Sequence, residues 1–424
     1  MKRMKKTLPA LLAPVVCLLL VGTLGLLTSC ADDEQPVPVV EEPALPPARV
    51  TDTIRYDKAK MTAYNIEYPS TDPYGQPVTL SGTITVGDEV AQHHARGLML
   101  YNHFTVYQAD QCPSHGDLTV QQLMVGSGLI TVSPDYYGFG ITGDFPQAYC
   151  VASANAQAAI DALIAARKLL AGMGYSWDDR LYNAGYSQGG QTTLGVVRLV
   201  SGRYPDIRFT RSFAGGGPYD IAETYRRFIA TGHTDMPATV VSVMQSYNDV
   251  FRLGLSPATM FLEPLLSHLD EWFLSKRYKQ SSIERLIGSE QLADFIAPAM
   301  LDLSSQPSRL LMSAVQQESL CAGWTPRADE QLTIVHNKSD LAVPVANADN
   351  LVAFLRAQGL PVTTDPAQPG VYARIEDFGA VPGLVGAHEL GAFYFLVTVI
   401  DQIGADLGIG LWLTPDFSLL ADML

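Results

Sequence analysis

Short apolar segments alternate with longer amphipathic ones along this chain, and this rhythm restricts the fold more than any other feature. Five uninterrupted apolar runs are typical of strands buried on both faces of a parallel sheet: residues 97–101, 128–132, 181–184, 332–335 and 371–375. Four segments carry apolar residues at helical spacing: 152–170, 188–199, 345–357 and 389–403. Such alternation predicts an α/β fold, with a mostly parallel central sheet and helices on both of its faces.

Two segments depart from this alternation. Residues 60–86 alternate in polarity on both sides of a break at 72–75, which is typical of antiparallel strands joined by a turn. Residues 222–327 show four helical patterns and no convincing strand: 239–251, 258–274, 281–301 and 308–320. We therefore expect one core, formed by residues 51–221 and 328–424, with a helical cap or lid inserted between two strands of its sheet.

The first thirty residues have the composition of an export signal. A basic start (residues 2–6), an uncharged apolar run (8–27) and two small residues precede Cys30. A transmembrane anchor is the alternative, because the run is nearly long enough to span a bilayer, but two prolines interrupt it. The segment resembles a bacterial lipoprotein signal. That resemblance implies removal of residues 1–29, attachment of acyl chains such as palmitate to Cys30, and a lipid anchor in the cell envelope, at the outer membrane or cell surface.

The charge of the chain excludes one class of partner. The chain has 28 Lys and Arg against 43 Asp and Glu, a net charge of −15, and loss of the four basic residues of the signal leaves 24 − 43 = −19. Nucleic acid binding needs clustered basic side chains, so no nucleic acid partner is expected. Residues 30–50 combine acidic side chains with prolines, which predicts an extended tether ahead of the folded body.

Three cysteines lie beyond the signal and Cys30. Cys112 and Cys150 flank one apolar strand and could form a disulfide, since such bonds persist outside the inner membrane. Cys321 would then be free. Three buried thiols are an equal alternative.

A candidate nucleophile lies in the pentapeptide Gly-Tyr-Ser-Gln-Gly at residues 185–189, which matches the pattern G-x-S-x-G. The pentapeptide alone is weak evidence, because a glycine-rich chain can contain it by chance. Its position is more specific, since it follows an apolar strand and opens a helical pattern, as a nucleophile elbow requires. The two glycines remove Cβ atoms that would collide in so sharp a turn. Ser187 is therefore the candidate nucleophile.

A serine nucleophile needs a histidine base and an acid that orients it, and in this fold they follow the serine in the order acid, then histidine. Asp340 lies in the loop after the apolar strand 332–335, shortly before the helical pattern 345–357. His388 is the one histidine of eight that lies beyond Asp340. Asp220, which follows a Gly-Gly-Gly-Pro segment, is the rival acid, and Asp340 could instead cap a turn or helix.

The same chemistry needs two backbone N–H groups that form an oxyanion hole. One comes from the residue after the nucleophile, which is Gln188. The other comes from the loop after an earlier strand, where Phe104 is the candidate. His103 would then have a structural role.

Residues 185–189, Asp340 and His388, in this order, resemble the α/β-hydrolase superfamily. Residues 133–140 (Ser-Pro-Asp-Tyr-Tyr-Gly-Phe-Gly), the segment 215–221 and the helical insertion are similar to those of secreted lipases and esterases. The resemblance covers roughly residues 55–405. The chain differs from many members of these families at residues 103–104, where it has His-Phe and they have His-Gly. The resemblance implies hydrolysis of small-molecule or lipid esters by a Ser-His-Asp acyl-enzyme mechanism, without a cofactor.

Other functions have weaker support in the sequence. Residues 138–143 satisfy the pattern G-x-G-x-x-G, but Asp-Phe-Pro follows in place of a helix, so dinucleotide binding is not expected. No metal-binding motif is present, and no metal site is expected. An exported serine peptidase of the same fold and a non-catalytic surface binding protein remain as alternatives. Neither the physiological substrate nor the oligomeric state follows from the sequence.

Overall fold

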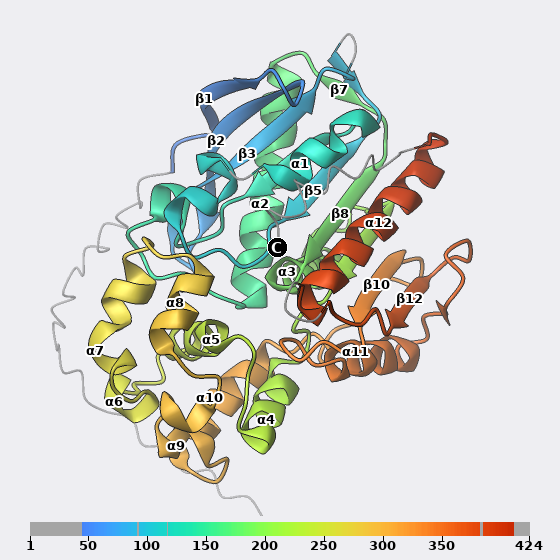
Figure 1. Ribbon diagram of the computed structural model, residues 1–424. Coiled ribbons are helices and arrows are strands. Elements are labelled where there is room, and N and C mark those ends of the chain that lie inside the picture. Colours follow the sequence, from blue (N-terminus) through green and yellow to red (C-terminus); the bar gives the residue numbers. More distant parts are fainter. Residues whose placement is uncertain (1–44, 91–92, 117, 382–384, 411–424) are drawn as a thin grey trace, which may run out of the picture. The chain divides into compact units, whose positions relative to one another are not determined.

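A ten-stranded sheet is the centre of the computed structural model, which describes residues 45–410 except 91–92, 117 and 382–384 (Figure 1). The described residues belong to one compact unit, Leu45–Leu424. The expected signal, Cys30 and most of the expected tether lie outside the described residues. The tether was expected to extend to residue 50, but the first strand already begins at Arg49.

The strand order of the sheet is β1-β2-β3-β6-β5-β8-β9-β10-β12-β11. Their bounds are β1 Arg49–Tyr56, β2 Met61–Thr71, β3 Pro77–Gly87, β5 Leu98–Asn102, β6 Ile130–Pro134, β8 Leu181–Tyr186, β9 Arg211–Gly215, β10 Leu332–Asn337, β11 Val362–Thr363 and β12 Val371–Glu376. β1, β2, β3 and β6 pair antiparallel, and the pairs from β6 through β5 to β11 are parallel. A separate parallel pair joins β4 (His94–Ala95) to β7 (Ser176–Trp177). The expected mostly parallel sheet is confirmed.

Helices cover both faces of this sheet (Figure 1). In β5, Leu98 and Leu100 pack in the hydrophobic cluster that includes α2 (Ala152–Gly172) and α3 (Gln188–Arg203), while Met99 packs with α1 (Thr119–Met124) and α12 (Ala387–Leu407). Side chains alternate because successive residues of a strand point to opposite faces. α11 (Ala346–Ala357) packs against β10 on the same face as α3. β5, β6, β8 and β10 are therefore buried on both faces, which explains their apolar sequences, whereas β12, beside the edge strand β11, is mostly half-buried.

One central strand was missed by the sequence patterns. β9 lies between β8 and β10 and pairs in parallel with both. It begins with Arg211 and Ser212 and ends at the glycines of residues 215–217, so its sequence lacks the long apolar run of its neighbours. Phe213 and Ala214 are nevertheless fully buried.

The segment between β9 and β10 is helical, and the strand-like contacts within it are two isolated bridges. Its helices are α4 Ile221–Thr231, α5 Pro237–Val250, α6 Pro257–Met260, α7 Leu265–Leu269, α8 Gln280–Ile287, α9 Pro298–Leu301 and α10 Gln306–Gln317. Two of the expected helices are each divided. The stretch 258–274 breaks after α6 at Phe261, whose backbone is extended, and helix resumes after Pro264 as α7. The stretch 281–301 breaks after α8 at Gly288, whose φ of 75° is left-handed.

Short turns complete the described elements. Five are 3₁₀ turns (Ala109–Gln111, Pro113–His115, Val125–Ser127, Gly140–Thr142 and Leu292–Asp294), and one is a π-helical turn (Asp270–Leu274). Among the described residues, α12 is long and apolar enough to cross a membrane by length and composition. Its apolar residues pack against β5, β8 and β9 in the hydrophobic core.

The disulfide that the sequence allowed is absent, because Cys112 and Cys150 are both free thiols. They occupy different hydrophobic clusters. Cys112 packs with Val106 and Phe139, and its thiol donates to the carbonyl of Ala109 at 3.3 Å. Cys150 packs in the cluster formed by the helical insertion. The alternative of buried thiols therefore describes these two residues, and Cys321 is also free.

Candidate active site

Ser187 lies in a sharp turn between the end of β8 and the start of α3. Its backbone has φ 58° and ψ −122°, a conformation that non-glycine residues rarely adopt. Close backbone contacts hold the turn. A Cβ atom at Gly189 would lie 2.1 Å from the carbonyl oxygen of Asn102, and one at Gly185 would lie 2.3 Å from the carbonyl oxygen of Gly189. Both positions therefore need glycine, and the turn presents the Ser187 hydroxyl at the carboxyl edge of the sheet.

Three side chains from distant parts of the chain form one chain of hydrogen bonds. Ser187 Oγ lies 2.9 Å from His388 Nε2, and His388 Nδ1 lies 2.6 Å from Asp340 Oδ2. Because a carboxylate accepts from Nδ1–H, Nε2 is left to accept the hydroxyl proton of Ser187. Asp340 follows β10, and His388 begins α12. The structure thus brings together the serine, acid and histidine that the sequence proposed.

Asp340 is positioned by its own loop as well as by His388. Its Oδ1 accepts the backbone N–H of Val343 at 2.8 Å, so it is also the turn aspartate that the sequence allowed as an alternative. Asp340 is 2% exposed, and it thereby offers His388 a carboxylate that water scarcely reaches. Asp220, the rival acid, has a different role, since it caps α4 by accepting the N–H of Glu223 and binds the amide of Asn350.

Opposing effects act on the pKa of His388. Burial favours the neutral ring, but the charge of Asp340 and its hydrogen bond outweigh burial, and Glu389 acts in the same direction, so the pKa lies above its ordinary value. A base must be neutral to accept a proton. The same environment therefore stabilises the imidazolium that proton transfer creates, and it limits the neutral form at low pH.

A second buried histidine lies near the same carboxylate. His336 Nε2 is 2.8 Å from the carbonyl oxygen of Val343 and 3.9 Å from Asp340 Oδ2. Burial lowers the pKa of His336, although Asp340 opposes this effect. The neutral ring can then donate its Nε2–H to Val343, which braces the loop that carries Asp340.

Sequence patterns missed the groups that hold His388 in place. The Tyr186 hydroxyl donates to the His388 carbonyl at 2.6 Å, and the Asn337 amide donates to the carbonyls of Ala387 and Gly379, both at 2.8 Å. Tyr186 is the variable residue before the serine, and Asn337 ends β10. Their adjacency to the motif and to the Asp340 loop was the signal that could have identified them.

The loop after β5 lies directly beside the elbow. The contacts between Gly189 and the carbonyls of Asn102 and His103 place it there. The His103 ring lies between two backbone carbonyls, with Nδ1 2.6 Å from the Phe104 oxygen and Nε2 3.2 Å from the Asp135 oxygen, and its neutral form donates to one of them. Its ring therefore contacts the backbone of the two loops that follow β5 and β6. The N–H of Gln188 belongs to the first turn of α3, where a helix provides no carbonyl partner.

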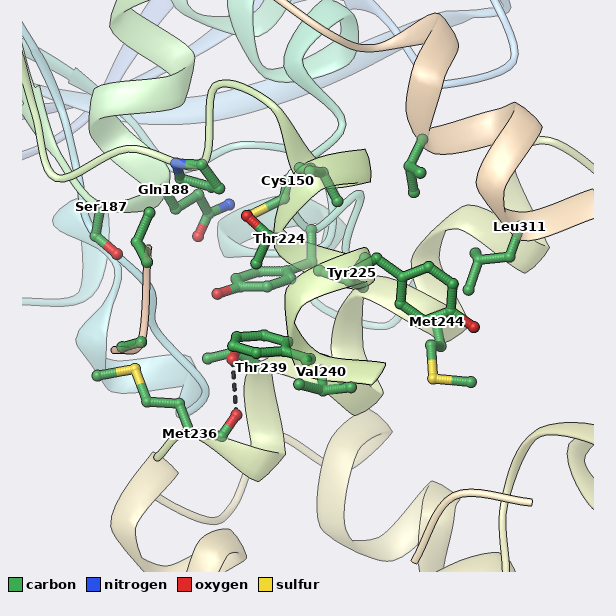
Figure 2. Close-up of a pocket in the computed structure, with 18 residues that line it drawn as sticks. Cys150, Ser187, Gln188, Thr224, Tyr225, Met236, Thr239, Val240, Met244 and Leu311 are labelled. Carbon is green, nitrogen blue, oxygen red and sulfur yellow. Dashed lines mark hydrogen bonds between the residues drawn. The ribbon is translucent and has the colours of Figure 1, made fainter. Parts of the chain in front are cut away.

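Two cavities meet at the hydrogen-bonded side chains. The first, of about 70 Å³, is lined mainly by apolar side chains of α4, α5 and α10 and reaches Ser187 and Gln188 (Figure 2). The second, of about 300 Å³, is more polar and is lined by His388, Asp235 and Glu389. Met236 and Ala342 line both, so the cavities adjoin.

Among the described residues, no group of three or more His, Cys, Asp or Glu side chains could hold a metal ion. The described site consists of protein groups that can transfer a proton, attack a carbonyl carbon and hold an apolar chain.

Comparisons with known proteins agree with this geometry. The structure is similar to a ligand-bound form of the rice cell wall degrading esterase LipA from Xanthomonas oryzae, with 19% identity, a TM-score of 0.68, and coverage of 85% of this chain and 98% of that one. It is also similar to Candida antarctica lipase A, with 15% identity, a TM-score of 0.63, and coverage of 84% and 81%. No curated protein matches the chain significantly in sequence.

At these identities the solved structures establish the fold, which is that of the α/β-hydrolases. A family model adds the sequence relationship, since residues 114–360 match the secretory lipase family, whose members are hydrolases that act on esters. The match includes Ser187 and Asp340 and the whole helical insertion, and it spans more than half of the chain. The chain therefore belongs to the secretory lipase family of α/β-hydrolases.

Proposed function

We propose that this protein is an exported serine hydrolase that cleaves carboxylic esters through an acyl-enzyme. The observation that carries the proposal is the hydrogen-bonded chain from Ser187 through His388 to Asp340, which opens directly onto an apolar cavity. The order and spacing of these groups match the requirements of a serine nucleophile, its base and the acid that orients the base.

In this mechanism, His388 Nε2 accepts the proton of Ser187 while Oγ attacks the ester carbonyl carbon. Asp340 holds the ring so that Nε2 faces the serine, and its charge stabilises the imidazolium. The tetrahedral oxyanion accepts hydrogen bonds from backbone N–H groups, for which we propose Gln188 and Phe104. The intermediate then collapses, and His388 returns the proton to the leaving alcohol. Water repeats the sequence to release the acid and regenerate Ser187.

The two cavities divide the substrate between them. The leaving oxygen must lie within reach of His388 Nε2, so the alcohol portion belongs in the polar cavity with Asp235 and Glu389. The acyl portion then enters the apolar cavity next to Ser187, between the helices of the insertion. In this assignment the insertion, residues 222–327, is a cap that builds the acyl pocket. An apolar pocket favours acyl esters over the peptide substrates of the alternative function.

The experiment is to replace Ser187 by alanine and measure hydrolysis of short p-nitrophenyl esters. We expect Ser187→Ala to lose hydrolysis and to lose labelling by a fluorophosphonate probe, because the attacking oxygen is removed. Ser256→Ala is the matched control. That serine lies in a similar Gly-Leu-Ser segment but caps α6, where its Oγ accepts the N–H of Thr259. Undiminished turnover in Ser187→Ala refutes the mechanism, and faster cleavage of aminoacyl amides than of esters favours a peptidase.

Export and anchoring form a separate part of the proposal. They are supported by the lipoprotein-like segment that ends at Cys30 and by the membership of a secretory family. In cells given an alkyne-tagged palmitate, we expect the full-length protein to incorporate the label and to fractionate with membranes. Cys30→Ala is expected to lose the label, and labelling that persists in this variant contradicts attachment at Cys30.

A further inference from the structure

The cavity beside Ser187 contains one polar side chain that its apolar surroundings do not explain. Gln188 is 4% exposed, and its carboxamide projects from the start of α3 into this cavity (Figure 2). Its Oε1 is buried without a hydrogen-bond partner in the described part of the chain. A buried amide oxygen without a partner costs free energy, so it is rarely retained unless a water or ligand donates to it.

The other polar side chains deep in the cavity already have partners. The Tyr225 hydroxyl donates to the carbonyl of Met300 at 2.6 Å, and the Thr239 hydroxyl donates to that of Met236 at 2.8 Å. Thr224 accepts the side-chain amide of Asn347 at 2.8 Å. The rest of the wall is mainly aliphatic and aromatic. Gln188 is therefore a single polar point in an apolar cavity, the arrangement by which pockets fix the orientation of a ligand.

The position of this amide along the cavity selects the part of the substrate that it meets. Figure 2 shows Gln188 beside Ser187 at the end of the cavity where the acyl carbonyl would be attacked, and Leu311 of α10 at the opposite end. The first carbons of a bound acyl chain would therefore lie next to the Gln188 amide, and its later carbons would contact mainly apolar side chains. A carboxamide both donates and accepts, which matches a hydroxyl group.

We propose that Gln188 selects acyl groups that carry a hydroxyl on the second or third carbon, followed by an alkyl chain. This inference rests on the proposed ester hydrolysis at Ser187 and names the class of acid that the site prefers. The hydroxyl would complete the hydrogen bonds of the amide, while the alkyl chain fills the apolar remainder of the cavity. A site built to bind a hydroxyl discriminates against the analogue that lacks it.

The test compares p-nitrophenyl esters of equal chain length: hexanoate, 2-hydroxyhexanoate and both enantiomers of 3-hydroxyhexanoate. The readout is the ratio of kcat/KM for each hydroxyacyl ester to that for hexanoate. This ratio is compared between the wild type and each variant, so differences in the intrinsic reactivity of the esters cancel. Gln188→Met keeps the length of the side chain and removes the amide, and it is expected to lower the ratio about tenfold for at least one hydroxy ester.

Thr239→Val is the matched control, because its hydroxyl lies in the same cavity but already bonds to Met236. We expect its ratio to equal that of the wild type. Equal ratios in wild type and Gln188→Met for every hydroxy ester overturn the proposal and leave water as the partner of the amide. Failure of the wild type to hydrolyse any ester sinks the proposed function instead, so the two failures are distinguishable.

Product inhibition of the wild type gives a second measurement that does not depend on the folding of a variant. The free acids 2-hydroxyhexanoate and 3-hydroxyhexanoate each differ from hexanoate only in the hydroxyl. We expect at least one of the two hydroxy acids to inhibit several-fold more strongly than hexanoate, since burial of a hydroxyl is favourable only where the amide can pair with it. Equal or weaker inhibition by both hydroxy acids contradicts the proposal.

Discussion

Replacing Gly189 by alanine tests whether the elbow depends on a backbone contact that excludes any side chain. The added Cβ would lie 2.1 Å from the carbonyl oxygen of Asn102 and 2.8 Å from that of His103, whereas real Cβ contacts are essentially never shorter than 3.0 Å. The elbow and the loop after β5 must therefore separate by at least 3.0 − 2.1 = 0.9 Å.

The partner of this contact has little freedom to move. Asn102 is fully buried at the end of β5, and its side-chain amide donates to Asn183 at 2.8 Å and to Thr193 at 2.9 Å. Overpacking a well-packed site costs about 1–3 kcal/mol, and this rigid neighbour favours the upper end. Alanine recovers about 0.5–1 kcal/mol of helix preference. We therefore expect a net loss of roughly 2 kcal/mol in the free energy of unfolding.

Gly202→Ala is the matched control in the same helix. A Cβ there meets nothing within 4 Å, and its φ is not in the left-handed region, so this variant should gain about 0.5–1 kcal/mol. Urea unfolding gives the two stabilities. Displacement of the elbow by about 1 Å should also lower kcat/KM for a p-nitrophenyl ester about 100-fold in Gly189→Ala. If Gly189→Ala matches Gly202→Ala in both stability and activity, the steric argument is wrong.

Two further predictions concern charge and thiol reactivity. Glu389→Gln removes a charge that raises the pKa of His388, so the acidic limb of the kcat/KM profile should move to lower pH, because the neutral base then persists at lower pH. Asp401→Asn, about 20 Å further along α12, should leave the limb in place; an unmoved limb in Glu389→Gln refutes the assignment. Burial raises the pKa of the Cys112 and Cys150 thiols to about 12, so both should resist iodoacetamide at pH 8 in the native protein. Both should become alkylated after denaturation without reductant, as peptide mass spectrometry can show, whereas a disulfide would keep them unlabelled.

Much of the fold could be predicted because its signals are local. The five strands expected from apolar runs are present, and four of them are buried throughout, since a strand covered on both faces needs apolar side chains at nearly every position. The fifth, β12, is mostly half-buried. β9 was missed because its buried part is only a few residues long, and its burial depends on the neighbours β8 and β10. Two long helices expected in the insertion are divided at Phe261 and Gly288, where the backbone leaves the helical conformation although the apolar pattern continues.

Part of the candidate site could also be predicted from local signals, and part depends on the tertiary structure. Ser187, Asp340 and His388 could be proposed from the elbow glycines, the loop positions and the order along the chain. The contacts that hold His388, from Tyr186 and Asn337, could not, because they depend on which backbone carbonyls those side chains reach. The possible pairing of Cys112 with Cys150 failed for a related reason, since closeness to one strand in sequence does not place two thiols in one cluster.

By itself, the sequence determined the class of the fold, the elbow and the residue types of the site. Periodicity and turn glycines act over short distances, and the order of the serine, acid and histidine can be read directly along the chain. Only the tertiary structure decided what these residues do together. Ser187 and His388 are 201 positions apart and meet because the sheet order brings the ends of β8 and β10 and the start of α12 to one edge. The direction of the Gln188 carboxamide was likewise decided by packing, since helices that follow β9 in sequence enclose the cavity into which it projects.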